Sequence, residues 1–242
     1  MNDDANLHPD SEQPKSGQSK PDLKSDLEAS AADVIPHDLS APSVGRLSLY
    51  HRELQRRLDA EITSINSKQL GKLVDVSPAV VRRDMSSLGT IGQRGVGYDV
   101  ATLIERIGTV LGAALQWNVI LIGVGSLGNA LMRYRGFDRL GFTLSGAFDN
   151  DPGCVGTSIA GIKIADIADL ETELAAQHAE LAILAVPAEH APEIADRLVA
   201  CKVNGILNFA PTTLRLPSEI AVVNVDLASE LQQLAFRVQT RK

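Results

Sequence analysis

The stretch NVILIGVGSLG, residues 118–128, decides the fold of this chain. Its first five residues form an apolar run rich in β-branched side chains, which is typical of a buried parallel strand. The glycine pattern G-x-G-x-x-G follows at Gly123, Gly125 and Gly128, and residues 129–134 have a helical pattern. Because the motif stands between a strand and a helix, it has the setting that a dinucleotide-binding turn requires.

Each glycine has its own task in such a turn. Gly123 permits the tight turn, Gly125 lets the backbone approach a pyrophosphate, and Gly128 lets the helix pack closely on the strand. The free N–H groups at the start of the helix supply hydrogen bonds and partial positive charge for the pyrophosphate. The candidate cofactor-binding residues of the turn are Gly123, Val124, Gly125, Ser126, Leu127 and Gly128.

An acidic residue follows the next predicted strand. That strand covers residues 142–148, and Asp149 comes directly after it, 21 positions past Gly128. The spacing is close to the ~20 residues expected for the acid that binds the adenosine ribose hydroxyls. A carboxylate there repels a 2′-phosphate, so the sequence favours NAD(H) over NADP(H). The alternative is a Rossmann-like fold that has lost its ligand.

Strand and helix patterns alternate through the rest of the C-terminal half. Strands are predicted over residues 162–164, 181–186, 205–209 and 220–225, and helices over residues 168–178, 190–203 and 227–241. This alternation predicts an α/β fold with a doubly wound parallel sheet, in which ligands bind beyond the carboxyl ends of the strands. Candidates for the nicotinamide half of the site lie at two of those ends: Val186, Pro187, Asn208, Ala210 and Pro211.

Charge divides the chain into three unlike parts. Residues 1–42 have a net charge of −6, residues 43–100 of +3 and residues 101–242 of −4, so the overall −7 does not exclude a nucleic-acid binder. The basic block has the size of a small helical DNA-binding module. Residues 1–42 contain five prolines and no aromatic residue, which predicts a disordered acidic tail.

Two helices are predicted at the start of the basic block. The first covers residues 44–58, with an apolar stripe at Val44, Leu47, Tyr50, Leu54 and Leu58. The second covers residues 67–74, with Ser67 as its predicted N-cap. A turn over residues 75–78 then leads into a third helix.

The third helix carries arginines near its N-terminal end. Ser77 is a good N-cap, and Pro78 takes the first helical position. Arg82 and Arg83 fall on the side away from the apolar residues that can face inward, which are Val80, Val81, Met85 and Leu88. This is the helix-turn-helix pattern, in which the second helix enters the major groove and arginine pairs with guanine edges or phosphates.

A glycine-rich segment follows the third helix. Residues 89–97 contain four glycines, which allow a tight two-stranded ribbon, a wing, with Arg94 at its tip. The alternative for the whole basic block is a small helical protein-interaction domain whose arginines are solvated.

Several other classes of protein are not indicated. No apolar stretch approaches the ~20 residues that a bilayer span needs, and the first ten residues lack the pattern of a secretory leader. Two cysteines, Cys154 and Cys201, are too few for a disulfide framework or a cysteine-built zinc site. We therefore expect a cytoplasmic protein with no membrane contact and no metal.

The main alternative is a catalytic NAD-dependent oxidoreductase with an accessory helical domain. Such an enzyme needs a substrate domain and an acid or base near the nicotinamide. His190 is the one plausible acid/base, although a polar residue in the first turn of a helix is the simpler interpretation. The tail and the basic block leave little chain for a substrate domain, so we expect no catalytic residues, and NADH and NAD+ as sensed ligands. A third interpretation is a nucleotide-sensing adaptor that binds protein.

From about residue 42 to the C-terminus, the chain resembles the Rex family of redox-sensing transcriptional repressors. The matching pieces follow the family's order, and they are Ser77-Pro78, Val81-Arg82-Arg83-Asp84, residues 93–98, the glycine motif, residues 148–152 with 155–156, residues 205–211, and residues 224–227 with Glu230-Leu231.

The resemblance implies a homodimer whose parts have separate tasks. A winged helix-turn-helix domain, residues 43–100, would bind double-stranded operator DNA with an inverted repeat. A Rossmann domain, residues 101–225, would bind NADH or NAD+, and a C-terminal helix, residues 226–242, would exchange between the subunits. NADH binding would release the dimer from the operator, so the protein would respond to the NADH/NAD+ ratio.

The resemblance also implies roles for single residues. Tyr134 resembles a tyrosine that responds to the redox state of the nicotinamide, and Arg52 with Asp226 resembles an ion pair that switches with the ligand. The implied DNA contacts are Ser77, Arg82, Arg83, Arg94 and Gly95. Cys154 stands where some relatives have a basic residue, and Ser87 where some have an aromatic one, so an adenosine contact and the operator preference do not carry over. Cys154 also suggests a thiol-redox alternative.

Overall fold

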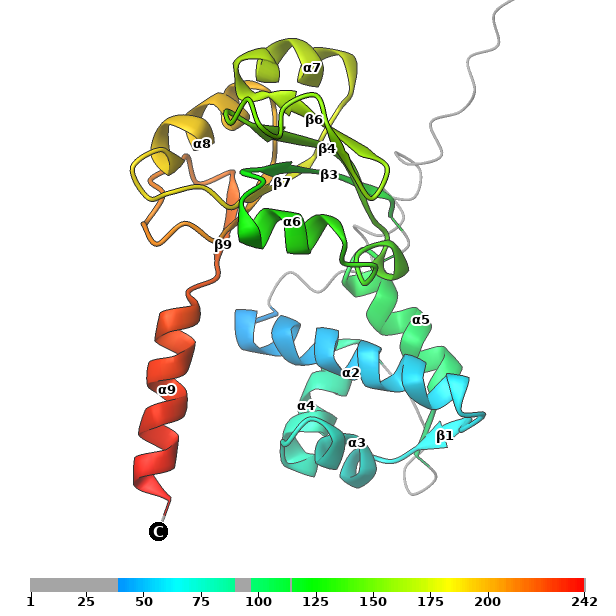
Figure 1. Cartoon of the computed structure of the whole chain (residues 1–242). Coiled ribbons are helices and arrows are strands. Elements are labelled where there is room, and N and C mark those ends of the chain that lie inside the picture. Colours follow the sequence, from blue (N-terminus) through cyan, green and yellow to red (C-terminus); the bar gives the residue numbers. More distant parts are fainter. Residues whose placement is uncertain (1–38, 90–96, 114, 242) are drawn as a thin grey trace, which may run out of the picture.

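The computed structural model of the chain describes residues 39–89, 97–113 and 115–241. A helical part and an α/β part lie one above the other, and helix α9 projects from the α/β part at the C-terminal end (Figure 1). Residues 1–38 of the predicted acidic tail lie outside the described ranges, and so do Arg94 and Gly95 of the predicted wing.

The α/β part is built on one sheet with the strand order β5-β6-β4-β3-β7-β8-β9. Neighbouring strands are parallel except β5 and β6. The strands are β3 (Trp117–Ile122), β4 (Phe142–Asp149), β5 (Ser158–Ile159), β6 (Ile162–Asp166), β7 (Leu181–Leu184), β8 (Gly205–Asn208) and β9 (Ala221–Asn224). The parallel strands follow the 3-2-1-4-5-6 order of dinucleotide-binding folds. The predicted doubly wound sheet is confirmed, whereas the short strand β5 was not predicted.

Helices cover both faces of the sheet, with α6 on one face and α7 and α8 on the other (Figure 1). Their bounds are α6 (Ser126–Met132), α7 (Leu170–Ala176) and α8 (Ala191–Ala200). In β3, Val119 and Leu121 pack in the cluster under α6, while Ile120 and Ile122 pack in the cluster under α7 and α8. Both faces of β3 are therefore buried, which explains its unbroken apolar sequence.

Two of these helices begin at positions other than those predicted. Helix α6 begins at Ser126, inside the glycine motif, because Gly125 takes the N-cap position. It ends at Met132, so Tyr134 lies beyond the helix and not in it. Helix α7 begins late because a 3-10 turn precedes it, η2 (Ile167–Asp169), which Asp166 caps by accepting from the Ala168 N–H. A second 3-10 turn, η1 (Asp138–Leu140), precedes β4.

Part of the sheet has no helix above it in the described chain. Helices α7 and α8, which join β6 to β7 and β7 to β8, both lie on the opposite face (Figure 1), so the strands β7, β8 and β9 have no helix above them on the side that carries α6. An apolar groove of about 520 Å³ lies there. Its lining includes Tyr134, Phe137, Leu181, Ile183, Leu207 and Val223. A large apolar surface of this kind on a single chain marks an interaction site.

The helical part has its own hydrophobic core. Its elements are α2 (Ala41–Asp59), β1 (Ser64–Ile65), α3 (Ser67–Leu73), α4 (Pro78–Ser87), β2 (Tyr98–Asp99) and α5 (Val100–Val110). The core residues of α2 are Leu47, Tyr50 and Leu54, as predicted. Val44 and Leu58 were predicted to belong to this stripe, but they are 38% and 42% exposed because they lie in the end turns of a 19-residue helix, away from the core.

The start of α3 differs from the prediction, and the start of α4 agrees with it. Asn66, not Ser67, is the N-cap of α3, because Asn66 and Gln69 form a capping box with reciprocal hydrogen bonds. Ser77 caps α4 and accepts from the Val80 N–H at 3.3 Å, with Pro78 at the first helical position.

The pairing around the predicted wing brings in an unexpected partner. Strand β2, which follows the undescribed residues 90–96, pairs antiparallel with β1, so Ile65 lies opposite Tyr98. The helix after it, α5, was not predicted, although Asp99 caps it and Leu103 and Ile107 enter the same core as α2. Residues 101–110 therefore pack with the helical part, on the N-terminal side of the expected Rossmann domain.

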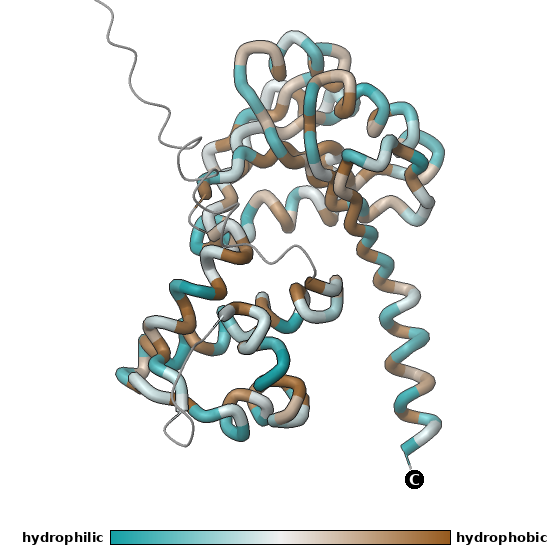
Figure 2. The backbone as a smooth tube through the Cα atoms, turned by 180° about the vertical axis from the view of Figure 1, so that it is seen from behind, coloured by the Kyte–Doolittle hydropathy of each residue, from teal (hydrophilic) through white to brown (hydrophobic). Residues whose placement is uncertain are grey.

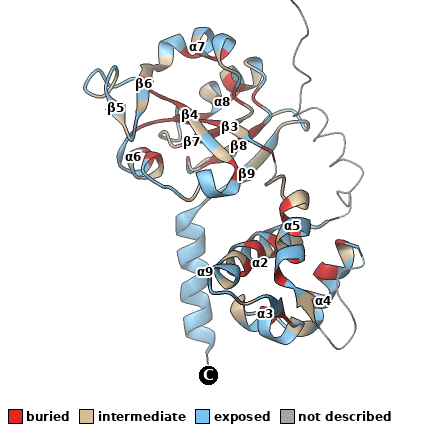
Figure 3. Ribbon diagram, turned by 90° about the vertical axis from the view of Figure 1, so that its right-hand side faces the viewer, coloured by how far each residue is buried: buried red, intermediate tan, exposed pale blue. Residues whose placement is uncertain are grey.

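Helix α9 (Leu227–Thr240) has no buried residue, and it packs against no other element of the described ranges. Asp226 caps it by accepting from the Ala228 and Ser229 N–H groups, which confirms the predicted helix start. Every residue of α9 is exposed, and apolar positions recur along its length (Figures 2 and 3). Within the described ranges, no helix combines the length and apolar character needed to cross a membrane.

Candidate functional site

The turn between β3 and α6 demands glycine at its first position. Gly123 has φ +92°, and a β-carbon there would lie 2.5 Å from the carbonyl oxygen of Ala185 and 2.9 Å from Val186 Cγ1. The Gly123 N–H also donates to the carbonyl oxygen of Phe148 at 2.9 Å. The end of β3 is therefore pressed between the ends of β4 and β7, where only backbone fits.

The other two glycines of the motif have opposite surroundings. A β-carbon at Gly128 would collide with the carbonyl oxygen of Gly123, so the close packing predicted for Gly128 is present. A β-carbon at Gly125 would have no neighbour within 4 Å. Gly125 thus faces open space at the start of α6, where a ligand's phosphates can approach the backbone.

Asp149 joins β4 to the glycine turn. One carboxylate oxygen accepts from the Val124 N–H at 2.5 Å, and the other accepts from the N–H groups of Asn150 at 2.7 Å and Asp151 at 2.9 Å. A carboxylate offers about four lone-pair positions, so one remains for a ligand hydroxyl. Asp149 therefore holds the turn in place and stays available as an acceptor.

A cavity of about 230 Å³ opens between Asp149 and the turn. It is smaller than the roughly 300–1,000 Å³ usual for a drug-sized ligand, so it has room for only part of a dinucleotide. It is lined by Ile122, Gly123, Gly125, Phe148, Asp149, Asn150, Ile167, Ala185, Val186, Pro187, His190 and Ile194. Apolar walls beside one carboxylate suit an adenine ring with its ribose.

Val186 and Pro187 line this cavity together with Asp149, and their contact with the nicotinamide half stays a prediction. Asn208 is 0% exposed and uses its side chain internally. Its amide nitrogen donates to the Thr212 carbonyl and to Asn224 Oδ1, each at 2.9 Å, and its oxygen accepts from the Ala210 N–H at 3.0 Å. Asn208 thus ties the ends of β8 and β9 together. Pro211 follows Ala210 on this loop and is exposed.

Tyr134 lies away from this cavity within the single chain. It is 60% exposed, packs edge-on against Phe137 with ring centroids 5.1 Å apart, and lines the apolar groove on the sheet. Two more turn residues, Ser126 and Leu127, are exposed on the first turn of α6.

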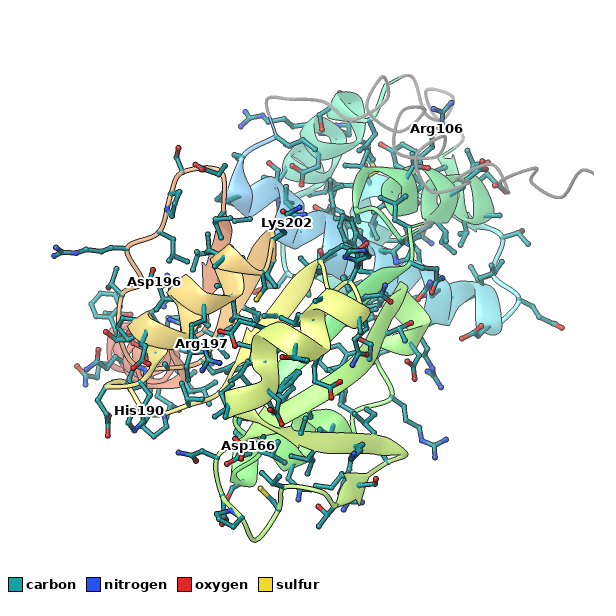
Figure 4. The ribbon with its side chains drawn as sticks, turned by 90° about the horizontal axis from the view of Figure 1, so that it is seen from above. Arg106, Asp166, His190, Asp196, Arg197 and Lys202 are labelled. Carbon is teal, nitrogen blue, oxygen red and sulfur yellow. The ribbon has the colours of Figure 1, made fainter. Side chains whose placement is uncertain are left out.

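Sequence reasoning missed the wall of the cavity formed by Ile167 and Ile194. Arg197 of α8 holds this wall: its guanidinium donates to the Ile167 carbonyl at 2.8 Å and to both carboxylate oxygens of Glu171. The hydrogen bonds from Arg197 lower the pKa of Glu171 to about 2. His190 and Asp166 lie on one side of the α/β part, away from Lys202 at the other end of α8 (Figure 4). No local motif signals the contacts of Arg197 with Ile167 and Glu171, because they join segments that are distant in sequence.

The helical part presents a basic surface on α3 and α4. Arg82 and Arg83 are exposed, as predicted. Arg82 leans toward α3 and donates to Ser67 Oγ at 3.2 Å, whereas Arg83 shares the outermost face of α4 with Ala79 and Ser86. Lys68 and Lys72 of α3 are exposed as well. Four basic side chains are therefore exposed on two consecutive helices.

A buried ionic cluster lies behind the exposed arginines. Asp84 of α4, with its side chain 1% exposed, accepts from Arg46 Nε and Nη2 at 2.7 Å each and from the Tyr50 hydroxyl at 3.0 Å. The hydrogen bond with Asp84 raises the pKa of Arg46, and burial together with Asp84 raises the pKa of Tyr50. Arg46 stays charged, and the Tyr50 hydroxyl stays a donor. Sequence reasoning missed this cluster because it spans two helices.

The implied ion pair between Arg52 and Asp226 is not formed within one chain. Arg52 contacts Glu53 at 3.3 Å, and Asp226 caps α9. Burial and the nearby Asp149 raise the pKa of the Cys154 thiol, which disfavours the reactive thiolate form. No cluster of His, Cys, Asp and Glu in the described residues has the arrangement of a metal site.

The fold and these two surfaces define a class of protein: a Rossmann domain joined to a helix-turn-helix domain. The family model "CoA binding domain" matches residues 115–212, and the model "Putative DNA-binding protein N-terminus" matches residues 38–86. Both matches coincide with the two parts of the structure.

Relatives and solved structures agree on one family. The chain is 63% identical over 204 residues to the redox-sensing transcriptional repressor Rex of Rhodopirellula baltica, covering 84% of this chain and 86% of the relative. It is 36% identical to the redox-sensing transcriptional repressor Rex 1 of Thermotoga maritima, and the match covers 87% of this chain and 99% of the relative. The crystal structure of RSP in complex with β-NAD+ and operator DNA has a TM-score of 0.77 and 33% identity, covering 83% and 92%. The crystal structure of RSP in complex with β-NADH has a TM-score of 0.76 and 31% identity, and the match covers 83% of this chain and 94% of RSP.

The chain therefore belongs to the Rex family of redox-sensing transcriptional repressors. Its relatives are named as repressors, so the oxidoreductase alternative is not supported. The resemblance inferred from the residues is confirmed.

The different surroundings of Gly125 and Gly128 predict different effects on stability. Gly128→Ala forces a β-carbon against the Gly123 carbonyl and should lower the free energy of unfolding by about 1–3 kcal/mol. Gly125→Ala meets open space at an ordinary φ of −63° and should change it by less than about 0.5 kcal/mol. Urea denaturation of both variants measures this difference. Equal effects would contradict the described turn.

Proposed function

We propose that this protein holds operator DNA as a homodimer and releases it when NADH binds in the Rossmann cavity. The observation that carries the proposal is that one chain joins the cavity between Asp149 and the glycine turn to the exposed arginines of α4. The relative RSP has been solved with β-NAD+ and operator DNA, and with β-NADH. A repressor acts on the chromosome, so we place the protein in the cytoplasm.

The ligand side follows from the cavity. Residues 123–128 bind the pyrophosphate through backbone N–H groups, and Asp149 accepts from the adenosine ribose. Val186 and Pro187 contact the adenine, and the loop of Asn208, Ala210 and Pro211 lies at the next strand end. NADH and NAD+ are sensed and not turned over, and Tyr134 responds to the nicotinamide.

The DNA side follows from α4. Arg83, on the outermost face, reads a base edge in the major groove, and Arg82 contacts a phosphate while Ser67 orients it. Ser77 lies at the start of the same helix. Arg94 and Gly95 of the predicted wing contact the DNA as well, a role that rests on the resemblance to the Rex family. The DNA-binding domain then covers residues 43–110, since α5 packs in its core.

A second copy of the chain covers the exposed apolar surfaces. Leu227, Leu231, Leu234 and Val238 form a stripe along α9, each more than half exposed, and the groove on the sheet is also apolar. Among the residues that the structure describes, none buries α9, so the helix packs on the partner, which is the exchange that the family implies. In that dimer Arg52 and Asp226 pair between subunits.

NADH can shift the equilibrium only through differential affinity. It must bind the DNA-incompetent arrangement of the dimer more tightly than the competent one. By linkage, operator DNA must then weaken NADH binding by the same factor.

The first test uses a DNA duplex selected from a random library by the wild-type protein. Gel shifts with this duplex should show release by NADH, and weaker or no release by NAD+. Gly125→Ala should bind the duplex as wild type does but lose the response to NADH, because its β-carbon occupies the approach to the pyrophosphate. Coenzyme A, which shares adenosine diphosphate with NADH, is the control ligand. Release by coenzyme A alone, or none by NADH, would refute the proposed function.

The two arginines should have unequal effects on sequence recognition. Arg83→Ala should cost about 1–3 kcal/mol on the selected duplex and relax specificity at one position of each half-site. Arg82→Ala should weaken binding to all duplexes alike and reduce the slope of affinity against salt by about 1. Competition against single-base variants separates the two. Loss of specificity with Arg82→Ala alone would reverse the assignment.

The dimer interface is tested on α9. Leu231→Glu and Leu234→Glu place charges in the apolar stripe and should convert dimers to monomers, measured by sedimentation at micromolar concentration. Glu230→Gln, on the same helix but outside the stripe, is the matched control. A dimer that persists in the double variant would contradict the role of α9.

A further inference from the structure

The ionic cluster of Arg46, Tyr50 and Asp84 joins two helices that have different tasks. Asp84 directly follows Arg82 and Arg83 on α4, while Arg46 and Tyr50 lie one turn apart on α2. The fork of Arg46 meets both carboxylate oxygens of Asp84 at 2.7 Å, and the Tyr50 hydroxyl adds a bond of 3.0 Å.

The cluster does more than bury surface. Val81, Met85 and Leu88 already pack α4 into the core, but apolar contacts are not directional. The two parallel bonds from Arg46 have a required geometry, so they set the rotation and height of α4 relative to α2. If α4 rotated by one residue position, each of its side chains would turn by about 100° around the helix axis. Arg83 would then no longer point into the major groove of the DNA.

Helix α2 is also connected to the Rossmann domain. The buried imidazole of His51, next to Tyr50, lies against Gly108 of α5, where an added β-carbon would be 3.4 Å from Nε2. After α5 ends, the Trp117 indole N–H donates to the Gly112 carbonyl at 3.2 Å, and Trp117 begins β3, the strand that runs into the glycine turn. Contacts thus lead from the turn through α5 and α2 to Asp84.

We propose that Arg46, Tyr50 and Asp84 are positioning residues that couple α4 to α2, so that NADH binding in the Rossmann domain changes the placement of Arg83 through α5 and α2. This coupling rests on the proposed function, since it is the contact between α2 and α4 through which NADH would affect DNA binding. Burial makes the contact effective, because a buried carboxylate that loses its partners has no water to replace them.

The test measures the ratio of operator affinities without and with saturating NADH. Arg46→Lys keeps the charge but loses the fork, and Tyr50→Phe removes only the hydroxyl and keeps the ring packing. Each should lower the ratio, by about 2- to 30-fold for Arg46→Lys and less for Tyr50→Phe, with ligand-free operator affinity moving toward that of the NADH-bound form. Arg56→Lys, the same change at an exposed position of α2, is the matched control.

Three further readouts separate coupling from stability. Without DNA, the variants should bind NADH with the affinity of wild type. The effect of operator on NADH affinity should shrink by the same factor as the ratio of operator affinities without and with NADH. The affinity of Arg46→Lys for non-specific DNA should be unchanged. A merely structural cluster would lower the thermal midpoint and leave the ratio of the folded protein intact. Unchanged ratios in both variants would overturn the coupling alone, whereas a wild-type protein that ignores NADH would overturn the proposed function itself.

Discussion

The backbone contact between Gly123 and Gly128 sets the geometry on which the ligand site depends. The Gly123 carbonyl faces the start of α6 so closely that residue 128 has no room for a β-carbon. Asp149 then closes the turn through the Val124 N–H, and the end of β7 presses on Gly123 from the other side. Because the strands are parallel, their carboxyl ends meet at one edge, and the open space that remains there is the cavity.

The same sheet leaves an apolar surface that supports the proposed dimer. Helices α7 and α8 lie on one face and only α6 lies on the other (Figure 1), so an apolar groove remains over β7, β8 and β9. Helix α9 extends from the last strand without any contact that would bury its apolar stripe. In the dimer that we propose, a second copy completes both surfaces, and this would place the ligand sites and the DNA-binding domains in one cooperative unit.

Much of this could be predicted from local patterns. The glycine motif with its strand, helix and acid predicted the Rossmann fold, and Ser77-Pro78 with the arginines predicted the start of α4. Helix α5 was missed. Asn66 is the N-cap that was assigned to Ser67, because capping depends on which side chain reaches the free N–H groups. The buried side chain of Asn208 donates to Thr212 and Asn224, a pairing that no spacing reveals.

The sequence by itself determined the order of the elements apart from α5 and β5, the close packing required at Gly123 and Gly128, and the residues with charge or hydroxyl groups for each task. These depend on period, propensity and conformational freedom, which act over a few residues. Only the tertiary structure decided which groups meet: Asp84 with Arg46 and Tyr50, Arg197 with Ile167, and Tyr134 with the groove instead of the cavity. Such meetings follow from how helices and strands pack together, and packing joins residues whose separation along the chain carries no signal.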